Sequence, residues 1–188
     1  MAPIGGLRPE GTLMRIVIAD AGPLIALARV QQLELLHRLF GVVWITEVIA
    51  AELGLQQSGL AGGSFRGLEQ LQQASRQGWL SIAPPNGIAD SYQPINPGVD
   101  AGEASAIGVA LQQQASGTHV LVLIDDRCGR AEARRQGLPI IGLAAVLVLA
   151  RESGLISACA PLLQALRKEG YYLSDRLVES VLQQVGEC

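Results

Sequence analysis

The sequence predicts a doubly wound α/β fold, in which helices cover both faces of a parallel sheet. Short runs rich in β-branched residues alternate with longer segments of helical period along most of the chain. The strand runs are almost continuously apolar, as expected for strands that are buried on both faces. Because parallel strands connect through right-handed crossovers, the topology is restricted to an α/β sandwich of this kind.

Length and composition place the chain among globular proteins. Its 188 residues suit one domain with a substantial core. Apolar residues make up 49% and charged residues only 16%, which excludes a disordered chain. The net charge of −3 and the aromatic share of 4% are not typical of a protein that coats nucleic acid, although a bound metal ion would reverse the charge locally.

Several other classes are excluded by pattern. The three cysteines, Cys128, Cys159 and Cys188, show no spacing suited to zinc. The longest apolar run, residues 140–150, is too short for a bilayer, and no signal peptide is recognisable. We therefore expect a cytoplasmic protein without a membrane partner.

The elements follow in a regular order after a leader. Residues 1–13 are rich in Gly and Pro and have no period, so we expect a flexible leader followed by a single domain over residues 14–188 that includes the C-terminal helices. The expected strands are RIVIAD (15–20), VVWIT (42–46), WLSIA (79–83), VLVLI (120–124) and LPIIG (138–142). The expected helices are PLIALARVQQLELLHRLF (23–40, one helix or two that meet around 30–33), EVIAAELGLQ (47–56), LEQLQQASRQ (68–77), DAGEASAIGVALQQQ (100–114), RAEARRQ (130–136), AAVLVLARES (144–153), SACAPLLQALRKEG (157–170) and SDRLVESVLQQV (174–185).

Acidic residues fall where open α/β sheets bind ligands, beyond the carboxyl ends of the strands. Asp20 ends the first strand, and Asp125 and Asp126 follow the fourth; Glu52 and Glu103 lie on helices that begin at the same edge. Such carboxylates would repel one another unless a divalent cation lay between them. Mg²⁺ and Mn²⁺ prefer oxygen ligands and keep waters, one of which can attack a phosphodiester. The residue types therefore suit metal-dependent phosphodiester hydrolysis.

Each acidic residue also has a purely structural interpretation. Asp20 would serve as a turn residue before a helix. Asp100 and Glu103 have the spacing of a capping box. One of Asp125 and Asp126 would only cap the next helix. Glu52 would be an ordinary solvent-exposed residue of its helix. The functional interpretation rests on the expected position of all these acidic residues at one edge of the sheet.

Four blocks in this order resemble the PIN-domain family, and most closely its bacterial and archaeal subgroup related to VapC-like toxin ribonucleases. The blocks are IVIADAGPLIALARVQQLELL, EVIAAEL, DAGEASAIGVAL and VLVLIDDRCGRAEARRQGLPIIG, and the tail GLISACAPLLQALRKEGYYLSDRLVESVL is also similar. The resemblance runs from about Met14 to the C-terminus. It implies a three-layer sandwich with a central parallel sheet of order 3-2-1-4-5, and a ribonuclease, a hydrolase that depends on Mg or Mn.

The resemblance also implies roles for residues. It assigns catalytic roles to Asp20, Glu52, Glu103 and Asp125, and metal-ligand roles to Asp20, Glu103, Asp125 and, peripherally, Asp126. A VapC-like role would add RNA as substrate, an antitoxin protein that masks the site, and a homodimer formed through the helices.

A basic face follows the last acidic residues. Arg127, Arg130 and Arg134 share one helical face, which we interpret as the RNA-binding surface because guanidinium groups contact phosphates. A cation at a helix N-terminus, as at Arg127, is unfavourable for the helix dipole and so suggests another benefit. The alternative is an ordinary solvated helix face.

Other enzyme classes find no support. The only lysine is Lys168, so no Walker-type phosphate loop exists, and no GxSxG or GxGxxG motif occurs. A haloacid-dehalogenase-type phosphatase needs a second Asp where Gly22 stands. The remaining rival is a PIN-like scaffold that binds RNA or a protein without cutting it. Ala21 and Ile124 favour it, because many relatives carry Ser or Thr there to support the carboxylates; the intact acidic set speaks against it.

Overall fold

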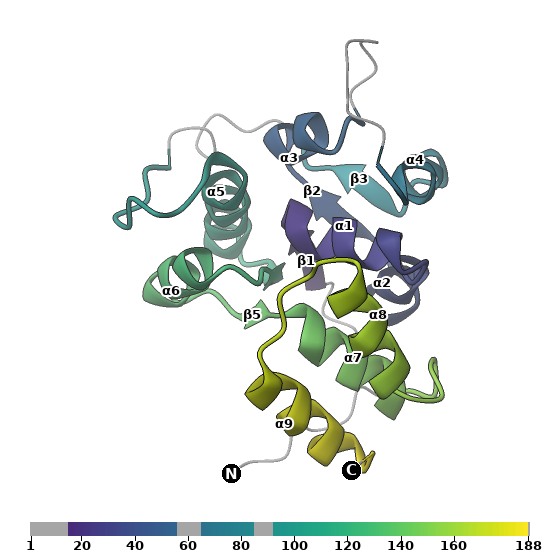
Figure 1. Cartoon of the computed structure of the whole chain (residues 1–188). Coiled ribbons are helices and arrows are strands. Elements are labelled where there is room, and N and C mark those ends of the chain that lie inside the picture. The colour runs from purple at the N-terminus through teal and green to yellow at the C-terminus, as the bar shows by residue number, and fades with distance from the viewer. Residues whose placement is uncertain (1–14, 56–64, 85–91, 188) are drawn as a thin grey trace.

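A single parallel sheet forms the centre of the molecule. The computed structural model describes residues 15–55, 65–84 and 92–187. Within them the sheet has the order β3-β2-β1-β4-β5, and every neighbouring pair is parallel, which confirms the expected topology (Figure 1). The strands are β1 (Arg15–Ala19), β2 (Val43–Ile45), β3 (Leu80–Ile82), β4 (His119–Leu123) and β5 (Ile140–Ile141).

The helices follow the predicted alternation. They are α1 (Ala21–Arg29), α2 (Glu34–Phe40), α3 (Glu47–Glu52), α4 (Leu68–Arg76), α5 (Ala101–Ala115), α6 (Arg127–Arg135), α7 (Leu143–Glu152), α8 (Ala160–Lys168) and α9 (Asp175–Val185). The first expected helix is a pair, because the chain turns at Gln31 with a φ of 58°. No helix in the described ranges is long and apolar enough to cross a membrane.

Three segments outside the expected helices and strands lie wholly or partly beyond the described residues. They are the expected leader (1–13), a Gly-rich stretch (59–67) and a loop with several prolines (84–99). Several boundaries differ from their predictions: α3 ends at Glu52 rather than at residue 56, and α8 spans Ala160–Lys168 rather than 157–170. α6 begins at Arg127, three residues before the expected start. It begins there because Asp126 accepts hydrogen bonds from the first backbone N–H groups of that helix.

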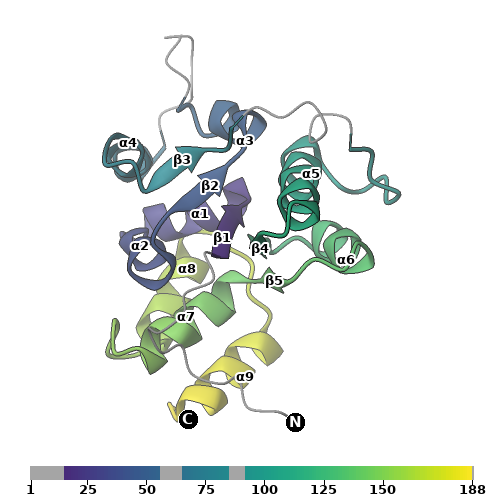
Figure 2. The same ribbon diagram turned by 180° about the vertical axis from the view of Figure 1, so that it is seen from behind.

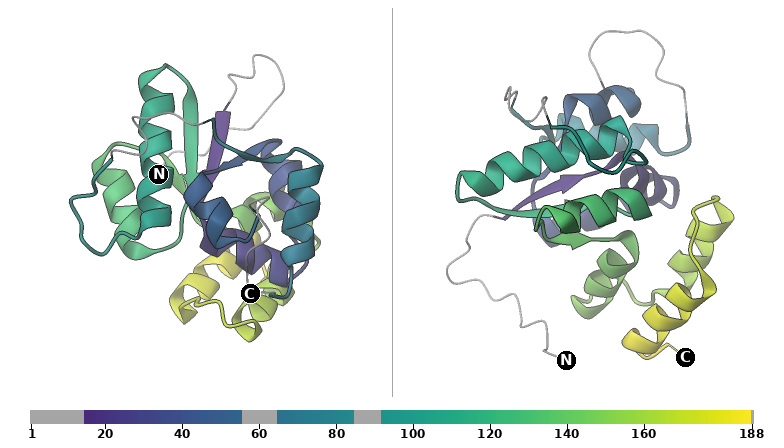
Figure 3. Two further views of the ribbon diagram at one scale, coloured as in Figure 1. Left: turned by 90° about the horizontal axis from the view of Figure 1, so that it is seen from above. Right: turned by 90° about the vertical axis from the view of Figure 1, so that its left-hand side faces the viewer.

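The helices form layers on the two faces of the sheet. On one face α5 packs against β1 and β4, and α6 packs against β5. On the other face lie α1, α2, α7 and α8, which contact one another in pairs, and α9 packs outside α7 (Figure 2). The right panel of Figure 3 shows α5 and α6 in front of β1. The molecule is therefore the α/β sandwich that the strand and helix pattern predicts.

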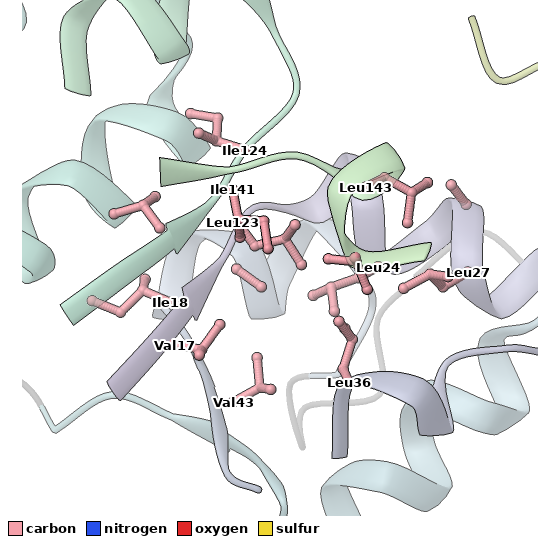
Figure 4. Packing of buried hydrophobic residues seen from close by; sticks show 14 of the residues in the cluster. Val17, Ile18, Leu24, Leu27, Leu36, Val43, Leu123, Ile124, Ile141 and Leu143 are labelled. Atoms are coloured by element: carbon pink, nitrogen blue, oxygen red, sulfur yellow. The ribbon is translucent and has the colours of Figure 1, made fainter. Parts of the chain in front are cut away.

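The core divides according to the alternation of side chains along the strands. Val17 and Val43 lie on the same side of the sheet as Leu36 of α2, whereas Ile18 and Ile124 lie toward α5 and α6 (Figure 4). All five are at most 1% exposed. Burial of each large aliphatic side chain contributes about 1.5–3 kcal/mol. This core therefore helps to hold the strand ends in place.

Hydrogen bonds join the C-terminal end of the described chain to the start of α8. The carboxylate of Glu187 accepts hydrogen bonds from the backbone N–H groups of Cys159 and Ala160, each at 2.8 Å, and lies 3.4 Å from Nε of Arg151. The bond from Ala160 contributes most to a lowered pKa of Glu187, followed by that from Cys159. Glu187 thus supplies the N-terminal cap that α8 lacks in its own sequence, because Cys159 at the cap position makes no side-chain bond there.

Candidate active site

The carboxyl ends of β1 and β4 lie side by side at the centre of the sheet. Ala19 pairs with Leu123, and the N–H of Asp20 donates to the carbonyl oxygen of Leu123 at 2.9 Å. Asp20 then begins α1 as its N-cap, and its Oδ2 accepts the N–H of Gly22 at 3.4 Å. The structural role expected for Asp20 is present, together with its position at the ligand-binding edge of the sheet.

The strand register places the acidic strand ends next to one another. Asp20 follows Ala19 directly, and Ile124 and Asp125 follow Leu123, the residue that pairs with Ala19. Ile124 points toward α6, where its Cδ1 would lie 2.5 Å from a Cβ added to Gly129. Asp20 and Asp125 therefore lie at the same edge of the sheet, beyond the ends of β1 and β4.

Asp125 is held at the start of α7. Both of its carboxylate oxygens accept the backbone N–H of Leu143, at 3.2 and 3.0 Å, and Oδ2 also accepts the hydroxyl of Tyr171 at 2.5 Å. Burial raises the pKa of the Tyr171 hydroxyl far above its ordinary value, and the charge of Asp125 raises it further. Tyr171 therefore stays protonated and donates.

Glu103 lies beneath Asp20 on the α5–α6 face, in the capping box expected from the sequence. Its N–H donates to Oδ1 of Asp100 at 2.8 Å, and its Oε2 accepts the N–H of Asp100 at 3.1 Å. Its other oxygen, Oε1, is buried without a hydrogen-bond partner, and the residue is only 2% exposed. The backbone at Gly129 closes this side, because a Cβ there would lie 2.5 Å from Oε1. Capping thus uses one oxygen and leaves the other free.

Two further acidic residues surround the same point. Asp126 begins α6, and its Oδ1 accepts the N–H groups of Cys128 at 2.6 Å and Gly129 at 3.3 Å. Glu52, at the end of α3, is exposed at the rim of the cluster. A Cβ on Gly102 would lie 3.3 Å from Glu52 Oε2 and 3.3 Å from Asp100 Oδ1, so both carboxylates rest against the first turn of α5.

Burial and neighbouring charges raise the pKa of three of these carboxyl groups. Burial raises the pKa of Asp20 to about 6, with the charges of Asp100 and Glu52 adding to it. Burial likewise raises the pKa of Glu103 to about 7, and the charges of Asp100, Asp126 and Asp20 contribute. The pKa of Glu52 is raised by burial and then by Asp100. Negative charge is therefore concentrated at one edge of the sheet, where it would be relieved by a cation.

The donor chemistry of the cluster fits a hard divalent cation. The ligands offered are carboxylate oxygens, and Oε1 of Glu103 is a buried acceptor without a partner that lies against Gly129. Across the described parts of the chain, however, no three Asp, Glu, His or Cys side chains converge closely enough to hold an ion as they stand. Capping explains part of this spread, since Asp126 and Asp125 both bind helix N-termini.

A buried glutamate positions the segment that leads into α5. Oε1 of Glu132 accepts the Tyr92 hydroxyl at 2.6 Å and the Ile95 N–H at 3.3 Å, and Oε2 accepts the Asn96 N–H at 3.3 Å. The bond from Tyr92 contributes most to holding the pKa of Glu132 below its ordinary value. These bonds fix the approach of the chain to Asp100, at the N-terminus of α5.

The three predicted RNA-binding arginines have different surroundings. Arg127 and Arg134 are exposed on α6. Arg130 is half-buried, and its Nη1 donates to the carbonyl oxygen of Ile124 at 3.0 Å. A Cβ on Gly142 would lie 2.7 Å from the same Nη1 and 2.6 Å from Oδ1 of Asp125, so the guanidinium lies beside this carboxylate. Arg130 thus supports the strand end, and Arg127 and Arg134 are the more accessible cations.

Sequence reasoning missed two contributors to the site. Asp100 was interpreted only as a cap, yet it is the one residue whose charge raises the pKa of Asp20, Glu52 and Glu103 alike. The sequence spacing of the capping box could have indicated it, because the cap must lie next to Glu103. Tyr171 was not considered at all, since it follows Asp125 by 46 positions and belongs to the C-terminal tail.

A family model described as a PIN domain matches residues 16–187, nearly the whole chain. No curated protein matches this chain.

Protonation of the acidic cluster links the stability of the metal-free fold to pH. Asp20 and Glu103 have folded-state pKa values of about 6 and 7, above their ordinary values of 3.8 and 4.5. The folded chain therefore binds protons more strongly, and its free energy of unfolding falls as the pH rises from about 4 to about 7. We expect a lower Tm in EDTA at pH 8 than at pH 5.

Asp20→Asn should remove much of this penalty while keeping a helix cap. It should raise the free energy of unfolding at pH 8 by about 1–3 kcal/mol, since one pKa unit corresponds to about 1.4 kcal/mol, with little effect at pH 4. Asp175→Asn is the control, because Asp175 is exposed on α9. Equal pH dependence of Tm in wild type and Asp20→Asn would contradict the raised pKa.

Two glycines at the N-termini of helices should differ in their tolerance of a methyl group. Gly129→Ala places its Cβ against Glu103 Oε1 and Ile124 Cδ1, whereas Gly22→Ala meets only Asp20 Oδ2 at 3.5 Å, an ordinary contact. We expect Gly129→Ala to destabilise the fold by about 1–3 kcal/mol and Gly22→Ala to be nearly neutral. Urea unfolding measures both. Equal effects would show that Glu103 is not confined by α6.

Proposed function

The chain belongs to the PIN-domain family, whose fold is of a nuclease type, and on this basis we propose that it is a ribonuclease that hydrolyses RNA phosphodiester bonds with Mg²⁺ or Mn²⁺ at its acidic cluster. The observation that carries the proposal is Oε1 of Glu103, a buried carboxylate oxygen without a partner. Asp20, Asp100 and Asp126 all add negative charge around it. A purely structural cap has no need of this concentration of charge, which costs folding stability.

In the proposed site, Asp20, Glu103, Asp125 and Asp126 would hold the ion through their oxygens. A bound divalent cation would supply Lewis acidity toward the phosphate and lower the pKa of a bound water. Glu52, exposed at the rim, would accept a proton from the attacking water, a role that suits its raised pKa. Oε1 of Glu103 would be available to the ion, because it has no hydrogen-bond partner in the fold.

RNA would approach along α6. The exposed guanidinium groups of Arg127 and Arg134 lie on the helix that Asp126 begins, next to the acidic cluster. They would bind phosphates of the substrate and offset the repulsion between RNA and an acidic protein. Arg130 would act mainly by supporting Ile124 and Asp125.

The VapC-like resemblance extends the proposal to a toxin of a toxin–antitoxin pair in the cytoplasm. In that role an antitoxin protein would mask the acidic cluster, and a homodimer would form through the helices. Purification together with the product of a neighbouring gene would test the antitoxin separately from the chemistry.

We expect the purified protein to cleave single-stranded RNA in the presence of Mn²⁺ or Mg²⁺. EDTA should stop cleavage, and added Mn²⁺ should restore it. Asp20→Asn should lower kcat/KM by about 1,000-fold, because it weakens several kcal/mol of transition-state stabilisation by the metal. A gel assay with labelled RNA measures the rate, and circular dichroism verifies that the variant is folded.

Asp175→Asn, on α9, is the matched control and should cleave at the wild-type rate. Cleavage that persists in Asp20→Asn would indicate a contaminating nuclease and sink the assignment. A protein that binds RNA, keeps its fold and cuts nothing with either metal would instead be a binding scaffold.

Removal of the exposed arginines should weaken RNA binding without changing the chemistry. We expect Arg127→Gln and Arg134→Gln each to raise KM and to reduce the slope of log affinity against log salt by about 1. kcat should stay unchanged. Arg176→Gln, exposed on α9, serves as the control. Unchanged KM and salt slope in both α6 variants would place the RNA path elsewhere.

A further inference from the structure

Asp125 is held by groups from two separate parts of the chain. Leu143 at the start of α7 donates its N–H to both carboxylate oxygens, at 3.2 Å to Oδ1 and 3.0 Å to Oδ2. Tyr171 donates its hydroxyl to Oδ2 at 2.5 Å. A carboxylate has about four acceptor positions, so these bonds occupy both of those on Oδ2 and one on Oδ1. The remaining acceptor position is on Oδ1, which lies beside Gly142 and the Arg130 guanidinium.

The segment that carries Tyr171 is itself fixed. After α8 the chain turns at Gly170, with a φ of 86°, and the N–H of Tyr171 donates to the Leu166 carbonyl oxygen at 2.9 Å. On the other side of Tyr171, the guanidinium of Arg167 binds the carbonyl oxygen of Leu173 at 2.6 Å. The hydroxyl is therefore presented to Asp125 by a short, anchored turn rather than by a free tail.

Contacts with α1 fix the same segment against the sheet. Arg29 donates from Nη1 to the carbonyl oxygen of Glu169 at 3.2 Å. A pocket of about 190 Å³ separates the two elements, and Gly22 and Tyr171 both line it. Since the N–H of Gly22 binds Asp20 and the hydroxyl of Tyr171 binds Asp125, the turn after α8 lies close to both central strand ends.

From this geometry we infer that Tyr171 is a positioning residue for the metal site: it fixes the orientation of the Asp125 carboxylate so that Oδ1 is the oxygen offered to the cation. The inference rests on the proposed function. It makes the turn between α8 and α9 part of the active site, although that segment lies far from the acidic motifs in the sequence. Ala21 and Ile124 have no hydroxyl group with which to support a carboxylate. Here the hydroxyl that binds the Asp125 carboxylate comes from Tyr171 in the C-terminal segment instead.

Tyr171→Phe tests the inference, with Tyr172→Phe as the matched control. Both variants lose one phenolic hydroxyl in the same turn, but Tyr172 is 86% exposed. Without the hydroxyl, Asp125 keeps its bond to Leu143 but is freer to rotate. Loss of such a supporting bond weakens metal binding or activity by about 10–100-fold. We expect Mn²⁺ affinity, measured by calorimetry, to fall by about 10-fold in Tyr171→Phe and to be unchanged in Tyr172→Phe.

Cleavage kinetics supply a readout that a general loss of stability would not reproduce. Tyr171→Phe should lower kcat at limiting Mn²⁺ with KM for RNA unchanged, and high Mn²⁺ should restore kcat toward the wild-type value. Equal Mn²⁺ affinity in wild type, Tyr171→Phe and Tyr172→Phe would overturn the inference. If wild type binds Mn²⁺ but cuts no RNA, the proposed function fails, while a weaker affinity in Tyr171→Phe alone still supports the role of Tyr171.

Discussion

The parallel pairing of β1 with β4 is the constraint on which the rest of the site depends. It brings the ends of the two strands side by side, so that Asp20 and Asp125 lie at the same edge of the sheet. The helices on each face meet these side chains differently. Toward α5 and α6, Asp20 lies among other carboxylates, and burial together with their charges raises its pKa. Toward α7, Asp125 is satisfied by a helix N-terminus and a phenol. One register thus produces two kinds of acidic residue from two adjacent strand ends.

The sequence predicted the fold well because local and global signals agree. Continuous apolar strands, helical periods and turn residues all indicated one topology, and the strand order came from the family resemblance. The site was predicted less completely. Asp20 and Glu103 could be placed from strand ends and the capping box. The orientation of Asp125 could not, because it depends on how Leu143 and Tyr171 approach in three dimensions. Spacing also could not separate Arg130 from its exposed neighbours, since all of them share the helix that Asp126 caps.

The cluster illustrates how a folded chain maintains charges that oppose its stability. Glu103 is surrounded by acidic residues and confined by the backbone at Gly129, so it has no space in which to turn away. Its two capping hydrogen bonds with Asp100 offset part of the unfavourable free energy of burying the carboxylate. The aliphatic core beneath, with residues such as Ile18 and Ile124 fully buried, supplies the remainder. A bound cation would neutralise part of this charge. The unfavourable concentration of carboxylates in the metal-free fold is therefore consistent with a cation-binding role.

The bond between Glu187 and the start of α8 lets a residue far from the acidic cluster influence it. Because Glu187 caps α8, and α8 leads directly into the turn that carries Tyr171, Glu187 is joined to Asp125 through one helix and one hydroxyl. Loss of the Glu187 carboxylate would remove no side chain of the acidic cluster, yet it would uncap α8 and loosen a support of the site. Among natural variants, substitutions at this position would therefore be under stronger selection than its distance from the acidic cluster suggests.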